Sequence, residues 1–144
     1  MTKVLLSIHV LAAIVAIGPV TVAASMFPAR VRAGADPAAL RTLHRICRVY
    51  AAVGIVVPVF GLATAGSLGV LGDAWLIVSI GLTALAAAVL GLLVLPRQQR
   101  ILAAPPDRGG RAPARLAMYT GTFNLLWVAV TVLMIVRPGS TTGA

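Results

Sequence analysis

Four apolar stretches, each long enough to cross a bilayer as a helix, most constrain what this chain can fold into. They are Val4–Met26, Tyr50–Leu71, Ala74–Leu95 and Ala117–Val136, and none has a charged side chain inside it. A hydrocarbon core of about 30 Å needs ~20 helical residues to span it. Because the core offers no water to backbone amides, each stretch must form a helix. The sequence predicts an all-α membrane protein whose four transmembrane helices form one antiparallel up-down bundle over residues 1–144.

The basic residues lie on one side of this predicted bundle. Five arginines lie between the first and second stretches and five between the third and fourth, whereas the other side has only Lys3 and Arg137. The positive-inside rule then places both basic connections in the cytoplasm and both termini outside. A net charge of +9 would suggest nucleic acid for a soluble protein. Here we predict no nucleic-acid partner, because arginines at the membrane edge contact anionic lipid headgroups. These arginines are Arg30, Arg32, Arg41, Arg45, Arg48, Arg97, Arg100, Arg108, Arg111 and Arg115.

Local signals refine this multi-pass topology in the cytoplasmic membrane. Asp36-Pro37 is typical of a helix start, with an N-cap followed by proline. Gly72-Asp73 leaves room only for a tight turn, with Asp73 as the cap of the next helix. The region Ala103–Pro113 and the tail Ser140–Ala144 are predicted to be the least ordered. The first stretch resembles a signal peptide, but its length and the arginines after it favour a true span.

His9 is the first candidate for chemistry inside the membrane. It lies roughly 7 Å below the outer hydrocarbon edge at 1.5 Å per residue, and an intramembrane ionisable residue usually faces the bundle interior. In one interpretation it is a neutral histidine hydrogen-bonded to a hydroxyl at similar depth. In the other it is a haem ligand, paired with Met134 or with His9 of a second copy. The hydroxyls at similar depth belong to Thr64, Ser67, Ser79 and Thr131.

The remaining polar candidates are interpreted as structural. His44 lies more than ~20 Å from His9 along the membrane normal, so the two cannot share a haem, and we expect His44 to be a solvated headgroup contact. The lone Cys47 excludes an internal disulfide or a cysteine metal cluster and is interpreted as an inert thiol at the inner edge. Asn124 is expected to satisfy a backbone carbonyl freed by Pro19 or Pro58. No catalytic set or metal site is predicted, and no Asp, Glu, Lys or Arg lies within the apolar stretches, which argues against an ion-coupled transporter.

The segment from Lys3 to Gly18, with His9 inside it, leads to a Phe27-Pro28-x-Arg30 exit. It resembles the first span of small four-span bacterial membrane proteins that form domain-of-unknown-function families. It is also distantly similar to the CopD-like and HemJ-like four-helix groups. The resemblance covers Lys3 to Arg30 and is topological elsewhere. It implies that His9 corresponds to the first-span histidine that is a candidate haem ligand in the HemJ-like group.

Together these features predict a small non-enzymatic protein that acts as an accessory or assembly subunit of a larger membrane complex. Small residues four positions apart, such as Ala12 and Ala16, allow close helix packing within the bundle, against partner subunits or in a homo-oligomer. The alternative is a haem-associated redox protein with His9 as a ligand. A carrier for a lipid or small hydrophobic molecule is a third possibility, which rests only on the proline-interrupted spans.

Overall fold

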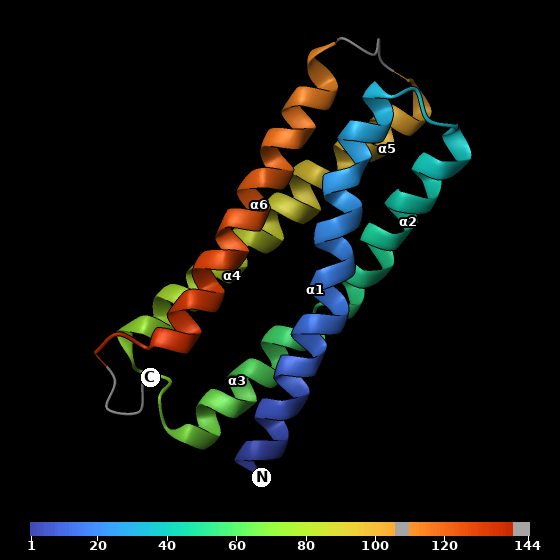
Figure 1. The fold of residues 1–144 in the computed structure, drawn as a ribbon. Coiled ribbons are helices and arrows are strands. Elements are labelled where there is room, and N and C mark those ends of the chain that lie inside the picture. The colour runs from blue at the N-terminus through green and yellow to red at the C-terminus, as the bar shows by residue number, and fades with distance from the viewer. Residues whose placement is uncertain (106–109, 140–144) are drawn as a thin grey trace.

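The computed structural model describes residues 1–105 and 110–139, and these ranges are helical with no strand. Its elements are α1 (Thr2–Arg32), α2 (Pro37–Val53), α3 (Val56–Leu68), α4 (Ala74–Ala88), the π-helical segment η1 (Val89–Val94), α5 (Leu95–Ala103) and α6 (Arg111–Val136). α2 leads directly into α3, and α4 runs through η1 into α5 (Figure 1). The prediction of four helices long and apolar enough to cross a membrane is confirmed. Part of the predicted loose connection, 106–109, and the tail 140–144 lie outside the described residues.

The second helix begins where its sequence signal predicts. Pro37 is the first helical residue, and the Asp36 carboxylate accepts a hydrogen bond from the Ala38 amide at 3.0 Å. A proline suits this position because the first amides of a helix have no partner within the helix. The cap fixes the start of α2 well before the apolar stretch, so that its arginines are carried on a regular helix.

The path from α2 to α3 is interrupted near Gly54, because of Pro58. Proline has no N–H to donate to the carbonyl four residues earlier. The Gly54 carbonyl instead accepts a bond from the Val57 amide at 3.1 Å, three residues on. The sequence predicted that Pro58 frees this carbonyl but not that the helix would break there. α2 and α3 lie on either side of α1 in Figure 1, and both pack against it.

The turn between α3 and α4 is tight, as the sequence predicts. Gly69 ends α3 in the left-handed region, with φ +72°, and the Val70 amide bonds back to the Ala65 carbonyl at 3.1 Å. This is the Schellman arrangement that glycine favours. Asp73 is the N-cap residue of α4, but its carboxylate makes no capping bond to the backbone. It accepts from the Trp75 indole N–H at 3.1 Å instead.

The third membrane-spanning helix, Ala74–Ala103, contains a π-helical turn where α4 meets α5. The Leu95 amide donates to the Leu90 carbonyl, five residues back, directly before Pro96. A proline at this point cannot donate to the Leu92 carbonyl, so the regular α-helical ladder is already broken there. Val89, Leu90 and Val94 of η1 are buried. The segment therefore faces the interior, and α5 continues beyond it to the arginine-rich end.

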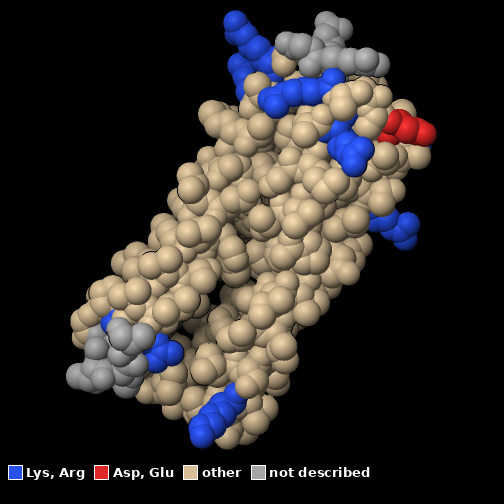
Figure 2. Space-filling model, in the orientation of Figure 1, with Lys and Arg blue, Asp and Glu red and all other residues tan. Residues whose placement is uncertain are grey.

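The main core lies toward the end of the molecule that holds the α1–α2 and α5–α6 connections, which we call the basic end. Phe27, Val94 and Leu116 are completely buried there, at the junction of α1, η1 and α6. Figure 2 shows most of the basic residues, all of them arginine, at this end, while the length of the molecule is covered by other residues. The many large apolar side chains exposed along the helices match a surface that faces lipid.

The opposite end, which we call the open end, is less tightly closed. There α3 packs against α1 and α4 packs against α6, while α3 shares few contacts with α4 or α6. A small cluster of Ala65, Trp75 and Leu76 joins α3 to α4 near their turn. Figure 2 shows an opening between the two helix pairs above this cluster. We call this opening the cleft.

Candidate functional site

His9 lies between α1 and α3 and is half-buried. Its Nδ1 donates to the Val57 carbonyl oxygen at 2.7 Å. The ring rests against Gly61, where an added Cβ would lie 2.8 Å from Cε1 of the ring. Only glycine leaves room for the ring at this position. In a neutral imidazole whose Nδ1 donates, Nε2 carries a lone pair that can accept a proton or bind a metal.

The predicted hydroxyl partner of His9 is wrong, because His9 binds a backbone carbonyl instead. The hydroxyls of Thr64, Ser79 and Thr131 each donate to the carbonyl four residues earlier on their own helix. The Ser67 hydroxyl is bonded to that of Thr2. This Thr2–Ser67 bond aligns α1 with α3 so that His9 lies level with Gly61 and its ring reaches the Val57 carbonyl one turn away. Counting from the ends of the apolar stretches placed His9 level with Thr64 or Ser67, which is one to two helical turns too close to the α3–α4 connection.

Met134, the residue predicted to pair with His9 as a second haem ligand, packs against the cluster of Ala65, Trp75 and Leu76. Its pairing with His9 stays a prediction. Residues 1–105 and 110–139 hold no group of three or more His, Cys, Asp or Glu side chains that could bind a metal ion.

Asn124 joins α6 to α1 rather than to a carbonyl freed by proline. Its Nδ2 donates to the Ser25 hydroxyl at 3.1 Å. The expected role beside Pro19 and Pro58 is wrong, because the Asn124 amide bonds to Ser25, and the Gly54 carbonyl already accepts from Val57. The buried Oδ1 of Asn124 has no hydrogen-bond partner among the described residues. Oγ1 of Thr120, one turn away on α6, is also buried without one.

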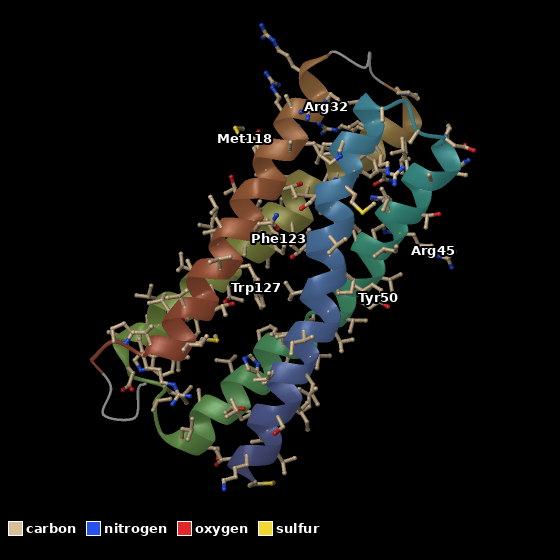
Figure 3. The ribbon with its side chains drawn as sticks, in the orientation of Figure 1. Arg32, Arg45, Tyr50, Met118, Phe123 and Trp127 are labelled. Carbon is tan, nitrogen blue, oxygen red and sulfur yellow. The ribbon has the colours of Figure 1, made fainter. Side chains whose placement is uncertain are left out.

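Trp127 is a residue that the sequence analysis did not single out. It lies three residues beyond Asn124 and four beyond Phe123, on the face of α6 that meets α1 (Figure 3). Phe123 is buried in the main core, but Trp127 is only half-buried because the helix pairs separate there. Its indole N–H makes no hydrogen bond to another described residue. The missed signal is position, since tryptophan favours membrane interfaces and Trp127 lies in the middle of its apolar stretch.

A second polar group lies at the basic end, where the sequence analysis expected solvent. His44, Gln98 and Cys47 are all buried. Nδ1 of His44 bonds to Oε1 of Gln98 at 2.9 Å, and Nε2 of Gln98 contacts the Cys47 sulfur at 3.7 Å. The prediction that His44 is a solvated headgroup contact is therefore wrong. It faces α5 because every third or fourth residue of α2, Leu40, His44 and Cys47, points into the core.

Gln98 was also missed, although its neighbours carry a usable pattern. Gln98 and Ile101 are the buried residues of α5, three positions apart, while Gln99 and Arg100 are exposed. On the adjoining face, Arg97 donates to the Tyr119 hydroxyl at 3.2 Å and its guanidinium lies 4.6 Å from the centre of the Tyr119 ring. Long polar side chains thus join α5 to both α2 and α6.

No protein-family model, curated protein or solved structure matches this chain. The resemblance of the first span to small four-span bacterial membrane proteins therefore stays a prediction. The candidate sites are the cleft with Trp127, the His9–Val57 contact between α1 and α3, and the His44–Gln98–Cys47 group.

Proposed function

We propose that this protein is a non-enzymatic accessory or assembly subunit of a larger complex in the cytoplasmic membrane. In this proposal a transmembrane helix of a partner subunit seats at the cleft, beside Trp127. The observation that carries it is the indole N–H of Trp127, which is half-buried in the middle of the fourth apolar stretch and makes no hydrogen bond to another described residue. Lipid chains offer such a donor no acceptor, whereas a carbonyl or polar side chain of a partner helix does.

The unpaired Oδ1 of Asn124 adds to this proposal. It lies one turn from Trp127 on α6 and is buried. The Trp127 N–H is half-buried at the opening, whereas Oδ1 of Asn124 is buried one turn away, so we propose that a partner helix displaces the side chains over Oδ1 as it enters the cleft and pairs both groups. Unsatisfied polar groups of this kind are costly in hydrocarbon, so a partner that pairs them gains binding energy that lipid cannot give.

Site-directed photo-crosslinking tests the partner. A photoreactive residue at position 127 should crosslink to one membrane protein in native membranes. The matched control is position 125 on the same helix, because Leu125 is 73% exposed and faces away from the core. Crosslinks to lipid alone at both positions, with a solitary monomer in mild detergent, would reject the proposal and favour a carrier of lipid or another hydrophobic molecule.

The proposed orientation is antiparallel, with both basic connections in the cytoplasm and both termini outside. The positive-inside rule supports it, and α1 begins at the same end of the molecule at which α6 ends (Figure 1). Cysteine labelling from outside, with Cys47 replaced by serine, should modify Ser140→Cys and leave Gly109→Cys unmodified. The reverse labelling would invert the orientation.

A haem-associated redox protein is the second candidate, and the geometry of His9 favours it. Nδ1 of His9 donates to the Val57 carbonyl, and ligating histidines commonly donate their other ring nitrogen to a carbonyl in this way. The lone pair of Nε2 is then available to iron. Haem would supply one-electron chemistry when bound. Protein expressed with ample haem should show a Soret band that His9→Ala removes, and its absence would reject this candidate.

A further inference from the structure

A groove of about 560 Å³ lies along α2 at the basic end, beside Leu102 of α5. Arg41, Arg45 and Arg48 line it. Their spacing of four and three residues places all three on one face of α2. Figure 3 shows Arg45 projecting outward from this helix. The groove therefore opens on the side of the bundle, where α2 meets α5.

Among the described residues, the three arginines have no acidic partner. All three are exposed, and no ion pair joins them to another residue within 1–105 or 110–139. The nearest carboxylate along the chain, Asp36, accepts from the amide of Ala38 at the start of α2. Planar guanidinium groups bind phosphate oxygens in pairs of parallel hydrogen bonds. A concentration of three such groups along one groove points to a phosphate ligand.

His44 adds a fixed polar atom to the floor of the groove. It lines the groove and is only 7% exposed. Because the amide NH₂ of Gln98 faces the Cys47 sulfur, its Oε1 accepts from Nδ1 of His44. The Nε2 atom of a neutral imidazole held in this way is an acceptor. The groove thus combines three cationic donors with one oriented acceptor, which suits a phosphodiester that also carries a hydroxyl.

The rest of the groove is apolar and continues toward the membrane. Val49 and Ala52 follow Arg48 along α2, and Leu102 adds a third apolar wall. These positions of α2 lie where the second apolar stretch begins, at Tyr50. A ligand that fills the whole groove therefore has an anionic head and a hydrocarbon chain. This distinguishes a lipid from a free phosphate compound.

We propose that this groove is a binding site for one anionic glycerophospholipid whose headgroup carries a free hydroxyl. The phosphodiester contacts the guanidinium groups of Arg45 and Arg48, and the headgroup hydroxyl donates to Nε2 of His44. The first carbons of an acyl chain lie along Val49 and Ala52. The proposal rests on the proposed orientation only for the leaflet that supplies the lipid, which the cysteine labelling tests separately.

Native mass spectrometry of the full chain in mild detergent, titrated with phosphatidylglycerol, tests the site. Each of Arg45→Gln and Arg48→Gln should weaken binding about fivefold, the effect of roughly one interfacial charge. The matched control is Arg30→Gln, which removes an exposed arginine of α1 at the same end but outside the groove. A loss in Arg30→Gln as large as in the groove variants would mean diffuse charge attraction and overturn the proposal.

Two further arms test the headgroup and the source of the phosphate. Phosphatidylethanol has the same charge as phosphatidylglycerol but no headgroup hydroxyl, so it should bind the unmodified chain several-fold more weakly. This arm needs no variant, and His44→Phe should abolish the difference where that variant folds. Equal binding of the two lipids would overturn the role of His44. Displacement of the lipid by millimolar soluble glycerol phosphate would assign the groove to a free phosphate compound and overturn the lipid proposal.

Discussion

The basic end and the open end of this bundle are built from similar apolar helices, yet one is closed and the other is split. At the basic end, long polar side chains connect different helices, as in the His44–Gln98 and Arg97–Tyr119 pairs. At the open end, the hydroxyls of Thr64 and Ser79 bond to their own helices instead.

The difference shows which polar residues hold membrane helices together. A serine or threonine hydroxyl that bonds back to its own helix is satisfied locally and joins nothing. An amide, imidazole or guanidinium group reaches the neighbouring helix. In the described part of the open end, the hydrogen bonds of His9 and of the hydroxyl pair Thr2–Ser67 join α1 to α3, and the Arg137 guanidinium at the end of α6 lies 5.4 Å from the centre of the Trp75 ring of α4. No hydrogen bond among the described residues of this end joins the α1–α3 pair to the α4–α6 pair. The two pairs therefore diverge from each other, and the cleft lies between them.

The largest expected effect comes from crowding the one close polar junction of the open end. Gly61→Ala places a methyl group 2.8 Å from the His9 ring. The ring must move and lose its bond to Val57, so we expect a loss of about 2–3 kcal/mol, typical of overpacking. The midpoint of thermal unfolding in one detergent measures it.

The matched control for this variant is Gly66→Ala on the same helix. Its added Cβ would meet only Leu71, at an ordinary 3.9 Å, so the midpoint should barely change. Combining Gly61→Ala with His9→Ala should recover most of the loss, because the clash disappears with the ring. Equal effects of the two glycine variants would mean that His9 does not pack against α3.

A smaller effect is expected at the basic end, from Gln98→Leu. This substitution leaves Nδ1 of the buried His44 and the buried Cys47 thiol without their amide partner. Stranding a buried polar group costs about 1–3 kcal/mol, and replacement of the buried amide by an apolar side chain offsets part of it, so we expect ~1–2 kcal/mol. Thermal unfolding measures this loss.

Gln99→Leu is the control for that variant, because Gln99 is the exposed neighbour on α5 and should be nearly neutral. A Gln98→Leu protein as stable as the parent would contradict the view that polar bonds across helices close the basic end. A double-mutant cycle with His44→Phe separates the His44–Gln98 contact from the effect on Cys47.

The comparison of the two ends also shows how far the sequence could lead. Span length, absence of internal charge and the Asp36-Pro37 signal predicted the four helices and the start of α2, because each depends on local chemistry. The partners of His9, His44 and Asn124 were predicted wrongly. Depth counting treats the helices as straight rods with a common edge, whereas the break at Gly54 and the π-helical turn before Pro96 alter which residues lie level.

Trp127 and Gln98 show a second limit of the sequence. Helical periodicity tells which residues share a face but not which helix that face meets. The burial of Gln98 depends on where α5 points after η1, and the half-burial of Trp127 depends on the separation of the helix pairs. Both are properties of helix packing, which here depends on long-range side-chain contacts such as Asn124 with Ser25.

The smallest expected effect is that of Asn124→Leu, between the two ends. The sequence-based expectation, a carbonyl freed by proline and paired by this amide, would make the variant costly. In the structure, the Asn124→Leu substitution loses one hydrogen bond to the exposed Ser25 hydroxyl, worth ~0.6 kcal/mol in membranes. The substitution also removes a buried Oδ1 that has no partner among the described residues. These contributions oppose one another, so the unfolding midpoint of the isolated protein should stay within about 0.5 kcal/mol of the parent. Ser25→Ala, which strands Nδ2 and keeps Oδ1, should be the more destabilising of the two. If a partner helix pairs with Oδ1, Asn124→Leu should weaken the photo-crosslink at position 127 while stability is unchanged. A large loss of stability in Asn124→Leu alone would mean that this amide holds α6 to α1. The polar bonds that close the basic end would then extend to the middle of the bundle.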